Sequence, residues 1–170
     1  LEAINCRSIK PLCGTSHLVK ELMNLERLLW TKNVKPSSGW AYCEFKKDEL
    51  FKLAWKDDED NANRPERYDL ILLRQHGYVT HLVKILNRQA EHDDDPNVFN
   101  IYRIVEVVWS IDGTNPPHSL KADLVFDYPE VLAYMGGNAM KLEELPTFTK
   151  RWDSDISAFQ SHVQSRLSAI

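Results

Sequence analysis

The sequence predicts an α+β fold in which a strongly twisted, mostly antiparallel β-sheet or small β-barrel is flanked by helices. Three runs of apolar and β-branched residues follow one another with short connections, at 68–74, 78–86 and 98–109. Strands in such close succession favour antiparallel pairing over a parallel arrangement with crossover helices. Amphipathic segments at 16–30 and 154–170 predict the flanking helices, because their apolar residues recur at intervals of three and four.

Length and composition indicate one globular domain. The chain has 170 residues, of which 43% are apolar and 27% are charged, and a chain of this length can bury a sizeable core. We expect an N-terminal helical extension at 1–35 and a barrel domain with a C-terminal helix at 36–170.

The central hairpin has the clearest pattern. The strand YDLILLR (68–74) leads into a tight turn at Gln75, His76 and Gly77, where Gly77 is free to adopt a positive φ. A long strand follows the next loop and places alternate apolar residues on one face, interrupted by Arg103. The remaining expected elements are short: a strand at 40–45, a helix at 47–55, a helix at 128–134 opened by Pro129, and an edge strand at 138–142.

Charge and cysteine content argue against several classes of protein. The net charge is −4, whereas a protein that binds nucleic acid mainly by neutralising phosphates is usually basic. The three cysteines, Cys6, Cys13 and Cys43, have unrelated spacings and predict free thiols. We expect a cytoplasmic protein with no cofactor and no membrane association, since no signal-like or membrane-spanning run occurs.

Motifs that would indicate catalysis or metal binding are absent from the sequence. It contains no GxSxG, HExxH, P-loop or GxGxxG pattern, so we expect no enzymatic activity and rank a nucleotide-processing enzyme third. The acidic run at 91–95 is typical of a solvated loop, with adventitious metal binding as the alternative. His81, in a predicted strand, is expected to be a structural hydrogen-bonding residue.

Aromatic residues offer the best indication of a binding site. The five tryptophans are numerous for this length, and Trp30, Trp55 and Trp152 are expected in the core. Trp40 and Tyr42, next to the flexible SSG turn, fit either core packing or stacking on a nucleobase. Four nearby cations are candidate phosphate contacts: Lys46, Lys47, Arg64 and Arg67.

The order of the strands resembles a known family. The segments YDLILLRQHG, YVTHLVKIL and IYRIVEVVW, followed by GGNAMKLEEL and a terminal helix, resemble the PUA-like barrels, in particular their EVE and YTH branches. Tyr68 stands where that pattern has a glycine before the aspartate. The resemblance implies a non-catalytic reader that admits one modified base of DNA or RNA into a pocket, often within a larger protein.

By position, the resemblance implies five base-pocket residues: Trp40, Tyr42, Arg74, His76 and Trp109. The alternative is a protein-interaction or dimerisation module of a multidomain bacterial protein. In that case the helices expected at 16–30 and 154–170 would form an apolar docking face.

Overall fold

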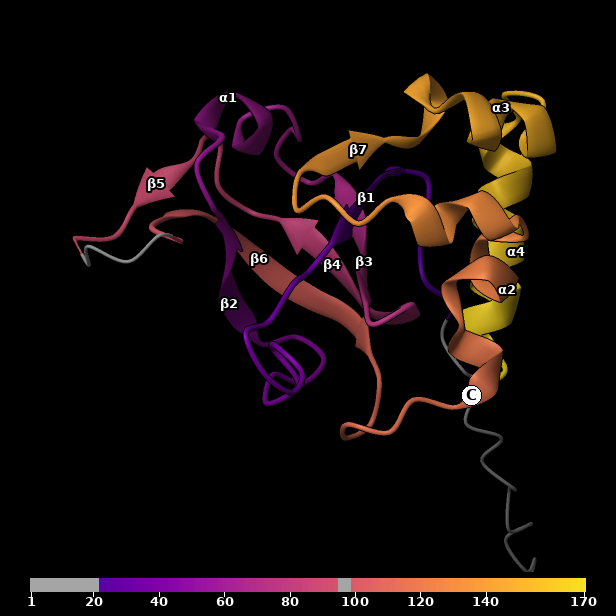
Figure 1. Cartoon of the computed structure of the whole chain (residues 1–170), viewed down its shortest axis with the longest axis horizontal. Coiled ribbons are helices and arrows are strands. Elements are labelled where there is room, and N and C mark those ends of the chain that lie inside the picture. Colours follow the sequence, from indigo (N-terminus) through magenta and orange to yellow (C-terminus); the bar gives the residue numbers. More distant parts are fainter. Residues whose placement is uncertain (1–21, 95–98) are drawn as a thin grey trace, which may run out of the picture.

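The computed structural model describes residues 22–94 and 99–170, and its centre is a curled sheet that forms a half-barrel (Figure 1). Neighbouring strands follow the order β2-β6-β4-β3-β1-β7, with β5 paired to β6. The β1–β3 pair is parallel, and the other pairs are antiparallel. The strands are β1 (Leu28–Asn33), β2 (Leu50–Trp55), β3 (Leu70–Gln75), β4 (Tyr78–Ile85), β5 (Glu91–His92), β6 (Ile101–Ser110) and β7 (Ala139–Lys141). The predicted α+β class and the mostly antiparallel sheet are confirmed.

Helices pack mainly on one side of the sheet. In Figure 1, α2, α3 and α4 lie together beside the strands, whereas α1 lies near β5. The helices are α1 (Glu59–Ala62), α2 (Ala122–Phe126), α3 (Pro146–Trp152) and α4 (Ile156–Ser168), with the 3₁₀ turns η1 (His118–Leu120), η2 (Pro129–Ala133) and η3 (Leu142–Glu144). No helix in the described ranges is long and apolar enough to cross a membrane.

Strand β3 is buried on both faces, which explains its continuous apolar sequence. Leu70 and Leu72 join the core beneath the helices, whereas Ile71 and Leu73 join the second core inside the curled sheet. Side chains alternate between the faces of a strand, so this strand connects the two cores. The turn after β3 has positive φ at His76 (50°) and Gly77 (80°), as expected for a two-residue hairpin.

The later elements also agree with the sequence. β3, β4 and β6 lie where the three strands were predicted, and α4 lies within the predicted terminal helix. The short helix opened by Pro129 is η2, and the short strand β7 is at the edge of the sheet. The N-terminus of α4 is capped by Asp155, whose carboxylate accepts from the amide of Ala158 at 3.0 Å.

Three predictions in the first third of the chain are wrong. Residues 28–30 of the expected helix at 16–30 belong to β1, residues 22–27 are not helical, and 16–21 lie outside the described residues. The segment 47–55 is not a helix, because it contains β2. The segment 40–45 consists of bends and turns, with Tyr42 at φ 64°, so it cannot continue as a strand.

Strand β1 also changes the outline of the sheet. It lies between β3 and β7, so the sheet extends across the boundary expected at residue 36. The cause is long-range pairing: Thr31 is in register with Leu72, and its hydroxyl donates to the carbonyl of Leu72 at 2.9 Å. Such pairing outweighs the local helical spacing of the leucines.

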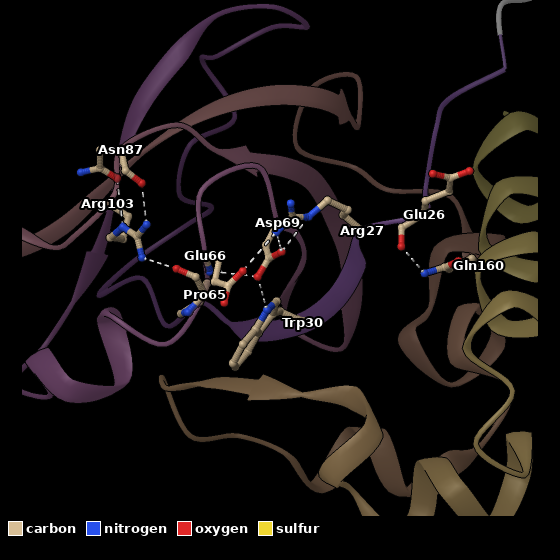
Figure 2. A network of polar contacts seen from close by, with 9 residues as sticks. All are labelled: Glu26, Arg27, Trp30, Pro65, Glu66, Asp69, Asn87, Arg103 and Gln160. Atoms are coloured by element: carbon tan, nitrogen blue, oxygen red, sulfur yellow. Dashed lines mark hydrogen bonds and ion pairs between the residues drawn. The ribbon is translucent and has the colours of Figure 1, made fainter.

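A buried carboxylate fixes the start of β3 (Figure 2). Asp69 is 2% exposed and accepts from Nε and Nη2 of Arg27 at 3.0 and 2.5 Å, from Nε1 of Trp30 at 2.9 Å and from the amide of Glu66 at 2.9 Å. Nearby, Gln160 of α4 donates to the carbonyl of Glu26 at 3.1 Å. These bonds attach the chain entering β1 to both β3 and α4.

Candidate functional site: the pocket at the end of the β3–β4 hairpin

The loop that carries Trp40 is held to the sheet by hydrogen bonds from three polar side chains. Gln75 clamps the backbone of Ala41, accepting from its amide at 2.8 Å and donating to its carbonyl at 2.9 Å. Nε2 of His76 lies 2.7 Å from the carbonyl of Gly39, and Nε2 of His81 lies 3.1 Å from the carbonyl of Tyr42. Residues 39–42 therefore have a fixed position although they form no regular structure.

The bonds of His81 are compatible with a neutral ring. Gln75 donates to the hydroxyl of Thr80 at 3.1 Å, and this hydroxyl lies 2.8 Å from Nδ1 of His81. If Nε2 donates to the carbonyl of Tyr42, Nδ1 accepts from Thr80, and every partner is satisfied. Burial lowers the pKa of His81, which also favours the neutral form. The prediction that His81 has a structural role is confirmed.

Trp40 lies against the turn of the hairpin. Its ring is half-buried and meets His76 edge-on, with centroids 4.7 Å apart and planes at 81°, and Tyr78 at 6.3 Å. Tyr42 instead stacks on Phe51 at 4.3 Å, and its hydroxyl accepts from the amide of Ala54 at 3.1 Å. The strand expected at 40–45 would place Trp40 and Tyr42 on one side. In the structure this strand does not form, and the two rings contact different residues.

A pocket of about 420 Å³ opens beside this turn. We call it the hairpin-end pocket, and it is formed where the end of β1, the β3–β4 turn and the segment after η2 meet. Its lining residues are Asn33, Val34, Lys35, Pro36, Arg74, His76, Gly77, Leu132, Tyr134 and Met135. The volume is within the range of small-molecule sites.

Arg74 and His76 are the two sequence-predicted residues that line this pocket, and Trp40 contacts it through His76. Trp109 is in a different place: it is paired with Leu82 and packs against the core beneath the helices. In the described structure its ring is not among those that contact Trp40 or Tyr42. The core positions predicted for Trp30, Trp55 and Trp152 are confirmed by their burial.

The four predicted phosphate contacts do not form one patch. Nζ of Lys46 lies 3.9 Å from the carboxylate of Asp112, and Lys47 is exposed in the same loop. Arg64 donates from Nη2 to both carboxylate oxygens of Glu144 at 2.8 Å, so an acidic partner already occupies it. Arg67 lies over the exposed ring of Tyr68 at 4.7 Å.

A second, more open concavity of about 360 Å³ lies beside Arg67. Its lining residues are Asn63, Pro65, Glu66, Arg67, Tyr68 and Arg88. Tyr68 has φ 74°, a conformation that bulky residues rarely adopt. Glu66 brings a carboxylate to this concavity, whereas the described lining of the hairpin-end pocket contains none.

No local pattern in the sequence indicates Lys35, Tyr134 and Met135 as pocket residues, because segments far apart in the chain bring them together. Nδ2 of Asn33 donates to the carbonyl of Met135 at 3.1 Å and joins the two walls. Among the described residues, no group of three or more histidine, cysteine or acidic side chains is placed to hold a metal ion. Cys43 is a free thiol, and Cys6 and Cys13 lie outside the described ranges.

No family model matches the chain, and neither the curated proteins nor the solved structures include a significant match to it.

Proposed function

We propose that this domain binds nucleic acid and accommodates a nucleobase, modified or unmodified, in the hairpin-end pocket without catalysing a reaction. This is the function implied by the resemblance to PUA-like barrels of the EVE and YTH branches. The observation that carries the proposal is a pocket of about 420 Å³ lined by Arg74 and His76, with the partly exposed ring of Trp40 beside it. Stacking on such a ring contributes about 1–3 kcal/mol per base.

The charges around the site fit recognition of a single base. Lys35 lines the pocket, and Lys46 and Lys47 are exposed cations in the segment that follows Trp40, whereas the net charge of the chain is −4. With so few phosphate contacts, affinity depends mainly on the pocket, and we expect a shallow dependence on salt. Extruding one base from a duplex costs a few kcal/mol, which contacts in the pocket must offset.

The experiment is a binding titration with oligonucleotides, with and without base modifications, at two salt concentrations. Trp40→Ala should weaken binding by roughly tenfold or more while the domain stays folded. The matched control is Tyr68→Ala, which removes an exposed aromatic ring at the other concavity and should leave the affinity unchanged. If only Tyr68→Ala weakens binding, the site lies beside Arg67. If no oligonucleotide binds, the proposal is wrong.

A second candidate function is protein docking. Two apolar side chains at the pocket, Leu132 and Met135, are 41% and 64% exposed, and exposed apolar patches often mark interaction sites. A stable dimer of the wild-type chain that Met135→Ser converts to monomer, without any oligonucleotide binding, would favour this function.

A further inference from the structure

Arg74 is fixed in place by only part of its guanidinium group. The residue is 3% exposed, and its Nε donates to the hydroxyl of Thr31 at 2.9 Å. Nη1 donates to the carbonyls of Val131 at 3.2 Å and Tyr134 at 2.9 Å. Nη2 is buried and has no hydrogen-bond partner among the described residues. Two N–H groups of Arg74 therefore lack an acceptor in the described structure. This is unusual, because buried polar groups are nearly always paired.

The charge of Arg74 also lacks a counterion among the described residues. All the partners of its guanidinium are a hydroxyl and two backbone carbonyls. Burial lowers the pKa of Arg74 to about 10, so the group is still charged at neutral pH. A buried cation without an anion is costly, and a ligand can remove that cost.

The surroundings of Arg74 are rich in donors. Lys35 and His76 line the same pocket, and the hydroxyl of Tyr128 is buried without a partner in the described structure. Burial raises the pKa of Tyr128, so this hydroxyl keeps its proton. The exposed carboxylate of Glu130 adds to the raised pKa of Tyr128 and of Tyr134. Among the described residues it forms no ion pair with Arg74. The hydroxyl of Tyr128 can accept as well as donate, but it is neutral, so only an acceptor with negative charge would also balance the charge of Arg74.

We propose that the hairpin-end pocket has an anion subsite, in which oxygens of a phosphate or carboxylate group accept from Nη2 of Arg74 and are attracted by Lys35 at the pocket. A neutral base carbonyl would satisfy the hydrogen bonds but leave the charge uncompensated, which is why the anion is favoured. The subsite goes beyond the proposed function. In a bound nucleotide it would hold the phosphate, but free phosphate would occupy it even if no nucleic acid binds.

The experiment is an NMR titration of the ¹⁵N-labelled full chain with inorganic phosphate or acetate, at an ionic strength held constant with chloride. We expect a saturable shift of the Arg74 Nε resonance and of backbone amides at 33–36 and 132–135. Phosphate binding more tightly than acetate assigns the subsite to phosphate, and the reverse order assigns it to carboxylate. An unshifted Arg74 resonance at the highest concentration of both anions overturns the proposal.

Variants separate a built subsite from adventitious binding. Arg74→Lys keeps the charge but loses the open branch, and should weaken the anion by about tenfold or more. Lys35→Ala should weaken it about two- to fivefold, whereas Lys150→Ala, an exposed cation on α3, should have no effect. Equal affinity in wild type, Lys35→Ala and Lys150→Ala would mean an adventitious ion only, even if Arg74→Lys fails to fold. Phosphate binding without oligonucleotide binding would disprove the base-binding function alone.

Discussion

Two buried arginines of this sheet differ in one respect. Arg103 of β6 is fully buried, and each of its three nitrogens donates. Nε donates to Oδ1 of Asn87 at 2.9 Å and Nη2 to the carbonyl of Asn87 at 2.7 Å (Figure 2). Nη1 donates to the carbonyls of Ala62 at 2.9 Å and Pro65 at 2.6 Å. Arg74 of β3 has the same kind of partners on two nitrogens and none on the third among the described residues.

This difference distinguishes the structural role of Arg103 from the binding role that we propose for Arg74. Arg103 ties β6 to α1, to Pro65 and to Asn87, and each of its three nitrogens already has an acceptor. Arg74 joins β3 to β1 and η2 through Nε and Nη1, whereas its Nη2 has no partner among the described residues. The residue also lines the hairpin-end pocket. Burial of a charged residue is therefore not evidence of function by itself. Our inference of a ligand rests instead on a buried nitrogen without a partner among the described residues, on a residue that lines a pocket.

The largest expected effect is on stability at Arg103. Arg103→Met leaves the carbonyls of residues 62, 65 and 87 without their donor and should lower the free energy of unfolding by roughly 3–5 kcal/mol. Arg74→Met should cost about half as much, because it also removes an unpaired buried charge. Urea unfolding measures both, with exposed Arg67→Met as a control of less than about 1 kcal/mol. A larger loss at Arg74 than at Arg103 would contradict the comparison.

A third buried cation extends the comparison to pH. Lys32 is 4% exposed; its Nζ donates to the carbonyl of Gly137 and lies 4.6 Å from the centre of the Trp55 ring. Burial lowers the pKa of Lys32 to about 7. The carbonyl and the ring both favour the charged form, so they oppose part of this lowering.

The lowered pKa makes the unfolded chain bind more protons than the folded chain between pH 7 and about 10.5, so stability rises with pH across this window. From pH 7 to 9, the wild type should gain roughly 2–3 kcal/mol relative to Lys32→Met. Urea unfolding at the two values tests this. Parallel pH dependence of the two proteins would show that the ring and carbonyl keep Lys32 charged throughout.

The sequence predicts best the parts of the fold that depend on neighbours in the chain. β3, the turn at His76 and Gly77, and β4 follow from alternation and turn chemistry. β1 could not be predicted in this way, because it pairs in parallel with β3, more than 40 residues later. β2 was predictable in principle: Phe51, Leu53 and Trp55 alternate as buried residues, but the spacing of Leu50 and Ala54 also fits a helix.

The site shows the same limit. The resemblance implies Arg74, His76 and Trp40 by their positions, and His76 and Trp40 also stand at or next to a turn. Tyr134 reaches the pocket through a bond to Arg74 across 60 residues, so no local pattern indicates it. The unsatisfied Nη2 depends on how many acceptors the fold brings to one guanidinium, which sequence does not express.

His81 combines full pairing, as in Arg103, with a charge that can change. Burial, the largest influence, lowers its pKa, and the bond to the Tyr42 carbonyl and the charge of Glu44 act in the opposite direction. The unfolded chain therefore binds more protons as pH falls below about 6.5, and stability should decline there by at most about 1.4 kcal/mol per pH unit. His81→Gln should flatten this decline in urea unfolding between pH 7 and 5. An equally steep decline in the variant would assign it to other groups.

The smallest expected effect tests the two arginines through a ligand. An anion that binds only the folded chain should stabilise it by about 1 kcal/mol at five times its dissociation constant. Phosphate also stabilises proteins without a site, because it is excluded from their surface; this contribution should be nearly equal in all variants. We therefore expect phosphate to raise the unfolding midpoint of wild type and of Arg103→Lys by more than that of Arg74→Lys, with chloride as the reference salt.

If Arg103→Lys proves too unstable to measure, Lys150→Ala takes its place, because the change on α3 leaves the pocket intact. Equal stabilisation of every variant would show that the open nitrogen of Arg74 binds no anion, and the contrast with Arg103 would then concern stability alone.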